Sequence, residues 1–434
     1  MFKKVGRMVV LLIGSAVLGA LLLTLVFCLP VSFMRQHVMT SVESMIPDED
    51  ALEKQEKPFL RYLWSERETY TDVIMVQNAI ERVEGKNAYE HAMWAYHYDL
   101  EEDVWTPENS LKAIYEGKST DDMFLHMYAR YWHGYLVYLK PLLMVFDWSQ
   151  IVVLGVVLQL CLMAVLIICS VRRGQAGVGI ATVAGFLFMK PALVLISLDM
   201  SVCWIITLGA LLTMVLKHEK LESGKTYPEL FLMIGILVAY FDFLTYPVVT
   251  LGFPLCAYFL MQKGDTLKRK LQKLIGYSIC WGGGYAGMWG MKWLIADLTL
   301  HTGTIRDAAW SIIGRTEAIG GRSRMNGGWY VISLNFQEYR WELYTVMAVM
   351  VALFVAITLL VALGKGVDWR KALGELLVYA LVFCIPFMWI IVVQHHSALH
   401  ARFTFRIISV AALAMISFGI SLIQTIFSEK CKKS

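Results

Sequence analysis

Charged residues are scarce in this sequence, and their scarcity narrows the class of protein. Asp, Glu, Lys and Arg make up 17% of the 434 residues, whereas 57% are hydrophobic and the mean hydropathy is +0.56. Soluble domains carry about 25% charged and roughly 45–50% apolar residues. The few charges fall in short clusters between apolar stretches of roughly 20 residues, the length of a helix that crosses about 30 Å of hydrocarbon. The composition excludes an ordinary soluble enzyme and predicts one membrane-embedded helical bundle.

Two further sequence patterns are missing: cysteines spaced for a metal site or for disulfides, and a stripe of basic residues. The eight cysteines have neither metal-ligand spacing nor the spacing of a disulfide framework, and most lie inside apolar runs as small hydrophobic residues. The net charge of +4 is modest, and the basic residues lie at the ends of apolar runs rather than in one stripe. Nucleic acid is therefore not expected as a partner.

Ten apolar segments are predicted to span the membrane. Basic clusters occupy every second connection, for example Lys3, Lys4 and Arg7 before the first segment and Arg172 and Arg173 after the second. By the positive-inside rule these connections are cytoplasmic, so both termini are expected on the cytoplasmic side of a plasma membrane. The first segment exceeds the 7–15 residues of a signal-peptide core, so we expect it to remain as an anchor. The segments are 8–30, 150–171, 175–195, 200–217, 228–245, 247–262, 274–296, 341–363, 372–393 and 405–428.

The predicted organisation follows from these segments. After the first transmembrane helix (1–30) comes a large outer region (31–149), expected to be helical at Tyr70–Val83 and Asp121–Tyr138, with an amphipathic interfacial helix within 128–146. Helices two to seven occupy 150–297, a second outer loop occupies 298–340, and the last three helices with a cytoplasmic tail occupy 341–434. A short third outer connection is expected at 394–404. The fold class is therefore an all-α membrane protein of about ten transmembrane helices.

Asp72 stands alone among apolar neighbours at the start of a predicted helix in the outer region. As an acid in the first turn it would stabilise that helix by about 0.3–1 kcal/mol. Held in a partly apolar pocket, it would instead suit a general base that takes a proton from an acceptor hydroxyl. The sequence leaves both roles open, and Asp72 is the candidate catalytic residue.

Three more outer residues are candidates for substrate binding. Arg130 and His133 lie among aromatic residues where the chain returns to the bilayer; a simple interfacial belt needs the aromatics but neither of these two side chains. They could bind a phosphate or a sugar hydroxyl. Asp242 lies at the outer end of a predicted span, where a carboxylate is costly unless it is paired or hydrated. It could bond neighbouring groups or serve the substrate.

Cations also gather on the outer side, where the positive-inside rule predicts few. Lys292, near the outer end of its segment, either snorkels to the interface or anchors a lipid phosphate. Arg315 belongs to a cationic loop, and such an excess calls for an anionic partner such as a lipid phosphate. The arginines of this loop are Arg306, Arg315, Arg322, Arg324 and Arg340.

The last outer connection is rich in histidine. His396 and His400 are four residues apart and can share a helix face, which admits a zinc site, but the segment lacks the third ligand and the glutamate of a His-Glu-x-x-His motif. Together with Arg406 they are better suited to bind phosphate or a sugar, so no metal ligand is assigned.

These residues resemble the C-type superfamily of polytopic membrane glycosyltransferases, in an uncharacterised bacterial branch. The resemblance is one of layout: a single helix, a large outer loop with Tyr70-Thr71-Asp72, and a bundle whose outer ends collect Asp, Lys, Arg and His. Further matching segments are 130–135, 241–247, 292–293 and 396–406. The acidic pair Asp121-Asp122 follows further along the same outer loop.

The resemblance implies a function. The donor would be a polyprenyl-phosphate-linked sugar, the acceptor an envelope glycan, lipid or protein on the non-cytoplasmic face, and the reaction an inverting displacement in a bacterial cytoplasmic membrane. Asp72 would be the base, and Lys292, Arg315 and Arg406 would hold the departing phosphate. The resemblance leaves open a divalent cation, Mg or Mn, and no other cofactor is expected.

Two alternative functions, from other classes of protein, stay open. A transporter or flippase of lipid-linked saccharide would have broken helices in matched halves and polar residues near the midplane; here the polar residues lie at the outer ends. A non-enzymatic envelope assembly protein would use the outer region to bind a partner, with structural histidines.

Overall fold

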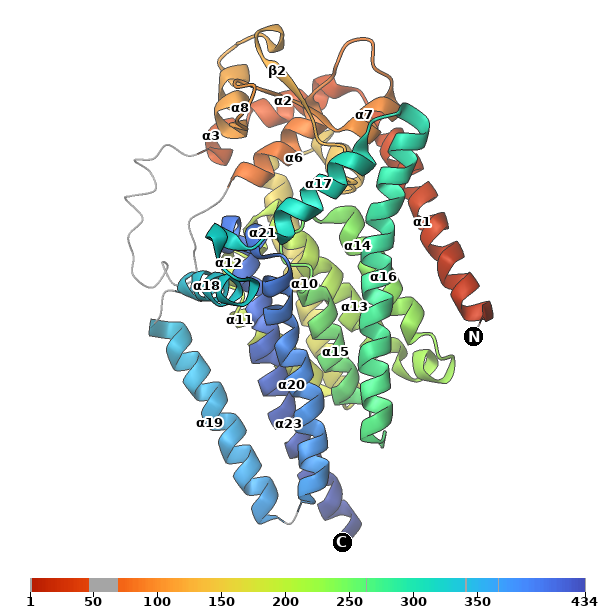
Figure 1. Cartoon of the computed structure of the whole chain (residues 1–434), viewed down its shortest axis with the longest axis vertical. Coiled ribbons are helices and arrows are strands. Elements are labelled where there is room, and N and C mark those ends of the chain that lie inside the picture. Colours follow the sequence, from red (N-terminus) through yellow and green to blue (C-terminus); the bar gives the residue numbers. More distant parts are fainter. Residues whose placement is uncertain (1, 47–68, 263, 340–341, 366, 434) are drawn as a thin grey trace.

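The computed structural model describes residues 2–46, 69–262, 264–339, 342–365 and 367–433, and these ranges are mostly helical. Figure 1 shows a bundle of long helices capped at one end by a layer of short elements. Arg340 lies outside the described residues, as do parts of the predicted regions 31–149 and 298–340. The long helices are α1 (Phe2–Phe27), α10 (Trp148–Arg172), α11 (Ala176–Leu187), α13 (Leu198–Ser223), α14 (Tyr227–Phe241), α15 (Val249–Met261), α16 (Leu267–Leu300), α19 (Glu342–Gly364), α20 (Trp369–Val392) and α23 (Ser409–Lys433).

The capping layer, here called the outer layer, comes from one stretch of sequence after α1. Its elements are α2 (Val31–Met39), α3 (Val42–Met45), α6 (Tyr70–Ile80), α7 (Ala88–Trp94), β1 (Tyr96–Asp99), α8 (Pro107–Tyr115), the 3-10 turn η1 (Thr120–Asp122), β2 (Phe124–Met127) and α9 (Leu136–Leu143). α17 (Thr304–Thr316), η2 (Ile319–Gly321), α18 (Arg324–Gln337), α21 (Gln394–Leu399), α22 (Ala401–Thr404) and η3 (Phe405–Ile408) lie between this layer and the bundle (Figure 1). α12 (Pro191–Ile196) precedes α13.

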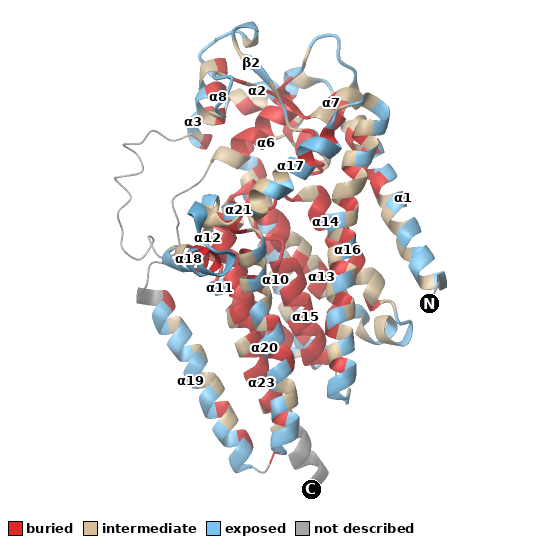
Figure 2. Cartoon of the chain, in the orientation of Figure 1, coloured by how far each residue is buried: buried red, intermediate tan, exposed pale blue. Residues whose placement is uncertain are grey.

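The chain is an all-α membrane protein, because six of its helices are long and apolar enough to cross a bilayer. All ten predicted segments fall on helices. However, α11, α14 and α15 are shorter apolar helices and α16 is not among the six, so the number of spans stays a prediction. Figure 2 shows α1 and α19 largely exposed, whereas α13 and α15 are largely buried. Exposed apolar side chains such as Leu353 and Ile357 on α19 therefore face the hydrocarbon.

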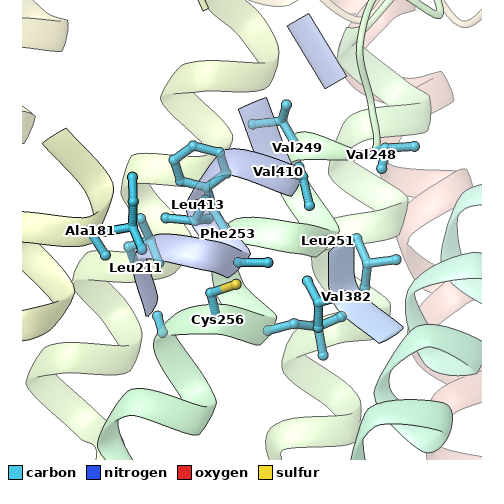
Figure 3. Close-up of a cluster of buried hydrophobic side chains, with 14 of the residues drawn as sticks. Ala181, Leu211, Val248, Val249, Leu251, Phe253, Cys256, Val382, Val410 and Leu413 are labelled. Carbon is cyan, nitrogen blue, oxygen red and sulfur yellow. The ribbon is translucent and has the colours of Figure 1, made fainter. Parts of the chain in front are cut away.

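The centre of the bundle is α15. Every residue of this helix is buried, so it has no polar face. Figure 3 shows Phe253 and Cys256 of α15 among side chains of neighbouring helices, including Leu211, Val382 and Leu413. A helix that is apolar all round is expected at the core of a helical membrane protein.

α14 and α16 pack closely through glycine. A Cβ on Gly235 would come within 2.1 Å of the Trp281 carbonyl oxygen, and one on Gly284 within 2.1 Å of the Leu232 carbonyl oxygen. Small residues at such contacts let two transmembrane backbones approach. The pairing matters for function because α16 carries α17, and with it Arg315, to the outer end.

The structure differs from the predictions in two places, one in the outer layer and one before α13. The predicted helix at Asp121–Tyr138 is wrong: residues 124–127 form β2, which pairs antiparallel with β1, and helix α9 begins only at Leu136. Tyr128, Tyr131 and His133 pack around Phe243, so aromatic packing sets the local conformation rather than helical periodicity. The predicted segment 175–195 is also broken, because Lys190 adopts a positive φ of 51° and Pro191 starts α12.

Candidate functional site

A cavity of about 440 Å³ lies at the outer end of the bundle, beneath the outer layer, and is here called the outer cavity. Six segments meet around it: the start of α6, the loop before α8, the aromatic loop before α9, the turn after α14, α17, and α21 with α22. Most of its wall is aromatic, and its polar groups are cationic or neutral. The lining residues are Tyr70, Thr71, Ile74, Trp105, Tyr128, Tyr131, Phe243, Thr245, Arg315, His396, Leu399, His400 and Phe403.

Arg315 is the cation of the outer cavity. Its Nε donates to Ser311 Oγ at 3.1 Å one turn earlier on α17, and the guanidinium carbon lies 5.6 Å from the centre of the Tyr131 ring. Within the described part of the chain, its Nη1 is buried and makes no hydrogen bond. A guanidinium held in this way presents unused donors to an anion, and its planar fork suits phosphate.

His396 and His400 stand together on the wall that α21 provides, with ring centres 4.7 Å apart. His396 Nε2 lies 2.9 Å from the Leu244 carbonyl oxygen. Because a carbonyl only accepts, Nε2 carries the hydrogen and Nδ1 of the neutral ring keeps a lone pair. Burial and then the nearby Arg315 charge lower the pKa of His396 well below 6.5, and the same two causes lower the pKa of His400 to about 4. Both rings are therefore neutral at pH 7.

Asp242 shapes the turn that holds His396. Its carboxylate accepts from the backbone N–H of Thr245 at 3.0 Å and from the Thr245 hydroxyl. Between them Leu244 has a positive φ of 68°, an uncommon conformation for a branched side chain. The turn aims the Leu244 carbonyl at His396 and places Thr245 in the cavity wall. Asp242 thus acts on the site through Thr245 and Leu244 and does not line the cavity.

Asp72 does not line the outer cavity, although Tyr70 and Thr71 do. The side chain points to the start of α13, where its carboxylate accepts from the N–H of Leu198 at 3.1 Å and of Asp199 at 3.0 Å. The Ser197 hydroxyl donates to it at 3.3 Å. These N–H groups have no partner within their own helix, so Asp72 caps α13 from another helix.

Lys292 and Arg130 connect the outer layer to α16 and α17. Lys292 is fully buried, and its Nζ donates to the carbonyls of Ala92 at 3.3 Å and Met93 at 2.8 Å, in the last turn of α7. Arg130 forms an ion pair with Asp307 of α17 at 2.7 Å. Neither side chain lines the outer cavity.

His133 and Arg406 lie behind the cavity wall. His133, at a positive φ of 54°, lies with Nε2 2.8 Å from the Tyr128 carbonyl and Nδ1 3.0 Å from the Tyr135 hydroxyl, and burial lowers its pKa to about 3. Arg406 is fully buried, with Nη1 donating to the Arg402 carbonyl at 2.8 Å, and it interacts electrostatically with Asp199 and Tyr339.

The nine candidate residues therefore separate into two groups. Arg315, His396 and His400 face the outer cavity, whereas Asp72, Arg130, His133, Asp242, Lys292 and Arg406 lie outside its lining. The sequence did not identify Trp105, Tyr70 or Thr71 as residues of the cavity wall. The position of Tyr70 and Thr71 directly before Asp72 was the available signal; Trp105 had none, because it stands in a polar segment far from the others.

Metal binding finds no support in the donor set. Among the described residues, no group of three or more His, Cys, Asp or Glu side chains is placed to hold a metal ion. The described wall of the outer cavity offers imidazole and guanidinium groups but no carboxylate. This set does not fit Mg or Mn, which prefer oxygen ligands, and we derive no step through such an ion.

Comparison with known proteins adds no family. No family model, no curated protein and no solved structure matches the chain. The class that fold and site define is an all-α membrane protein with a cationic, aromatic cavity at one end of its bundle.

Proposed function

We propose that the protein is a membrane glycosyltransferase that takes a sugar from a polyprenyl-phosphate donor at the outer cavity, on the non-cytoplasmic face. The observation that carries this proposal is the lining itself: Arg315 with His396 and His400 beside a wall of aromatic rings, in about 440 Å³. A cavity of this size holds a small ligand. Aromatic faces suit a sugar ring, and the guanidinium suits the phosphate attached to it.

A lipid-linked donor is favoured by a second, apolar cavity of about 470 Å³. It lies between α19, α20 and α23, at the depth of apolar helices, and its walls include Phe336, Ala348 and Phe383. Phe403 lines the outer cavity and Ile408 lines the apolar one, so the two flank one short segment that contains buried Arg406. An isoprenoid chain in the apolar cavity could therefore carry a head group to Arg315.

The proposed reaction is a displacement at the anomeric carbon. The acceptor hydroxyl oxygen forms the new bond to that carbon, the bond to the phosphate oxygen breaks with its electron pair, and the polyprenyl phosphate leaves against Arg315. Charge that develops on this oxygen is where a preorganised cation lowers the barrier most. Inversion of configuration rests on the resemblance to the C-type superfamily.

For the proton of the acceptor hydroxyl, the geometry favours His396 over Asp72. His396 is oriented by Leu244 and keeps a lone pair on Nδ1, the arrangement of a base held by a second group. Its low pKa makes it a weak base in the empty cavity, but an arriving phosphate would raise that pKa. The Asp72 carboxylate would first have to leave two backbone donors of α13. We therefore assign Asp72 to positioning and His396 to proton transfer.

The test compares His396→Gln with His395→Gln, an exposed neighbour outside the cavity lining. Membranes of cells that lack the protein supply acceptors, purified protein is added, and a panel of polyprenyl-phosphate hexoses and pentoses, labelled in the sugar, supplies donors. We expect label transfer with the natural protein and His395→Gln, and roughly 100-fold less with His396→Gln, within the 10²–10⁴-fold typical of general-base removal. Equal transfer by both variants would remove His396 from the mechanism.

A non-enzymatic protein that binds lipid-linked saccharide is the second candidate. It is favoured by the lack of any carboxylate in the described cavity lining, since two carboxylates or a carboxylate base are common in sugar chemistry. The same donor panel separates the two: binding of the labelled donors without release of polyprenyl phosphate, in the presence of acceptor membranes, would support the binding protein.

A further inference from the structure

A third cavity, of about 770 Å³, lies at the opposite end of the bundle from the outer cavity and is here called the basal cavity. The start of α16, the start of α20, the end of α15 and the last turns of α23 surround it. Phe259, Leu260 and Leu422 give it an apolar side, and Lys270, Arg370 and Lys371 give it a basic side. The cavity thus has both characters at the depth where α16 and α20 enter the bundle (Figure 1).

The acidic residues of the basal cavity are already neutralised. Glu375 forms an ion pair with Lys270, and Asp265 pairs with Lys273 at 2.8 Å. Arg370, by contrast, forms no ion pair within the described ranges of the chain, and its guanidinium lies 5.5 Å from the ring of exposed Trp369. Arg370 therefore keeps a positive charge on the α20 side that no carboxylate of the described residues pairs with.

The N-terminus of α16 adds to this positive charge, whereas the Asp368 carboxylate offsets the partial charge at the N-terminus of α20. α16 begins after Thr266, which accepts from the Arg269 N–H, and α20 begins after Asp368, which accepts from the Arg370 N–H at 2.9 Å. Each helix start carries a partial positive charge and backbone donors. Thr266, Leu267 and Arg370 line the cavity, so both starts border it.

Glu375 requires a hydrogen-bond donor on the ligand, in contrast to the cations, which require an anion. One of its oxygens holds Lys270, while Oε2 is buried and accepts no hydrogen bond from any described residue. A buried carboxylate oxygen without a donor is costly, and a ligand hydroxyl or a water would relieve that cost. A ligand that matches the cavity therefore carries an anion and, close to it, a hydroxyl donor.

We propose that the basal cavity binds the head group of phosphatidylglycerol, with its phosphate between Arg370 and Lys371 and a glycerol hydroxyl donating to Glu375. Basic residues that served only to orient the chain in the membrane would need contact with water alone. Here they border a hollow that also contains an apolar wall and an unsatisfied acceptor, which is the design of a site between transmembrane helices for an anionic lipid.

The experiment measures lipid binding to the purified full chain in detergent by native mass spectrometry and by the shift in unfolding temperature. Phosphatidylglycerol, phosphatidic acid, phosphatidylcholine and inorganic phosphate are each added. We expect the strongest binding with phosphatidylglycerol, weaker binding with phosphatidic acid, which lacks the head-group hydroxyls, and no stabilisation by phosphatidylcholine or inorganic phosphate. Equal stabilisation by phosphatidylglycerol and phosphatidylcholine in the natural protein would overturn the proposal without any variant.

A double variant with its matched control, and then a single variant, test the location of the site. Arg370→Gln with Lys371→Gln should weaken phosphatidylglycerol binding about tenfold or more, since each basic residue near anionic lipid contributes about 1 kcal/mol. The control, Arg172→Gln with Arg173→Gln, removes a basic pair that does not line the cavity and should leave the specific binding intact. Equal losses in both double variants would mean general attraction to negative lipid, against a site. Glu375→Gln should reduce the preference for phosphatidylglycerol over phosphatidic acid, and an unchanged preference would contradict the role of Glu375.

Discussion

Two sets of buried polar side chains lie close together at the outer end, and they differ in what they have left to bond. Asp72, Asp242 and Lys292 use their donors or acceptors in hydrogen bonds to backbone groups of the protein. Arg315 and His396 keep a guanidinium nitrogen and a ring nitrogen available to the outer cavity. Burial of a charged residue in a membrane protein therefore does not by itself mark a substrate site; unused bonding capacity beside a cavity does.

The largest effect on stability is expected from Asp72→Ala. The change leaves two backbone N–H groups of α13 without their acceptor in a buried place, at roughly 1–3 kcal/mol each, so we expect a loss of about 2–6 kcal/mol. Thermal unfolding in detergent measures it. Asp147→Ala, which removes the cap of α10 at its own N-terminus, should cost only about 1 kcal/mol.

A normal unfolding temperature for Asp72→Ala, together with lost sugar transfer, would contradict this assignment. Asp72 would then belong with the cavity residues, as a base that the resting structure keeps aside. Asp72→Asn sharpens the result, because its amide oxygen can still accept one backbone hydrogen bond, and a structural role predicts partial recovery of stability.

Acid should destabilise the outer layer through His97. This residue is fully buried in β1 against Trp105 of the cavity wall, and burial, with the charge of His126, lowers its pKa to about 4. Because the folded pKa lies below the unfolded value of about 6.5, the unfolded chain binds the proton first as the pH falls. Stability is therefore lost between about pH 6.5 and 4, by up to about 3 kcal/mol.

His97→Phe should remove this share of the acid sensitivity. Unfolding temperatures at pH 7.5 and pH 4.5 give the measurement, with His395→Phe, at an exposed histidine of α21, as control. An identical drop on acidification in His97→Phe and the natural protein would assign the effect to other groups, of which His133 is the nearest in kind.

Lys292→Met should loosen the join between the outer layer and the bundle. The methionine fills the space but cannot donate to the carbonyls of Ala92 and Met93, so we expect a loss of about 2 kcal/mol and faster amide exchange in α7. Lys86→Met, which removes an exposed ion pair with Glu90 beside the same helix, should cost far less. Retained α7 protection in Lys292→Met would return Lys292 to the phosphate-binding residues.

The sequence predicted the helices better than the site. Apolar runs of 20 residues identify helices such as α10 and α20 because the bilayer imposes that length. They could not reveal the β1–β2 pair, whose strands are four residues each and lie 24 residues apart at their nearest ends. The grouping of Arg315 with His396 is a contact between distant segments, and no local pattern encodes it. Asp72 was correctly placed at a helix start, but its target, the backbone of α13, is set by tertiary packing.

The smallest effect on stability, with a large effect on binding, is expected from Arg315→Gln. Its hydrogen bond to Ser311 is local and its other close partner, Tyr131, belongs to the same cavity wall, so the unfolding free energy should change by only about 1 kcal/mol. A charge-assisted hydrogen bond to phosphate is worth about 1.5–3 kcal/mol, so binding of a polyprenyl phosphate, measured by displacement of a fluorescent analogue, should weaken roughly 10- to 100-fold. Arg306→Gln, an exposed arginine of the same helix outside the cavity lining, should bind normally. If Arg315→Gln instead unfolds easily and binds as before, the cavity arginine is structural like Lys292, and unused bonding capacity would lose its value as the sign of a site.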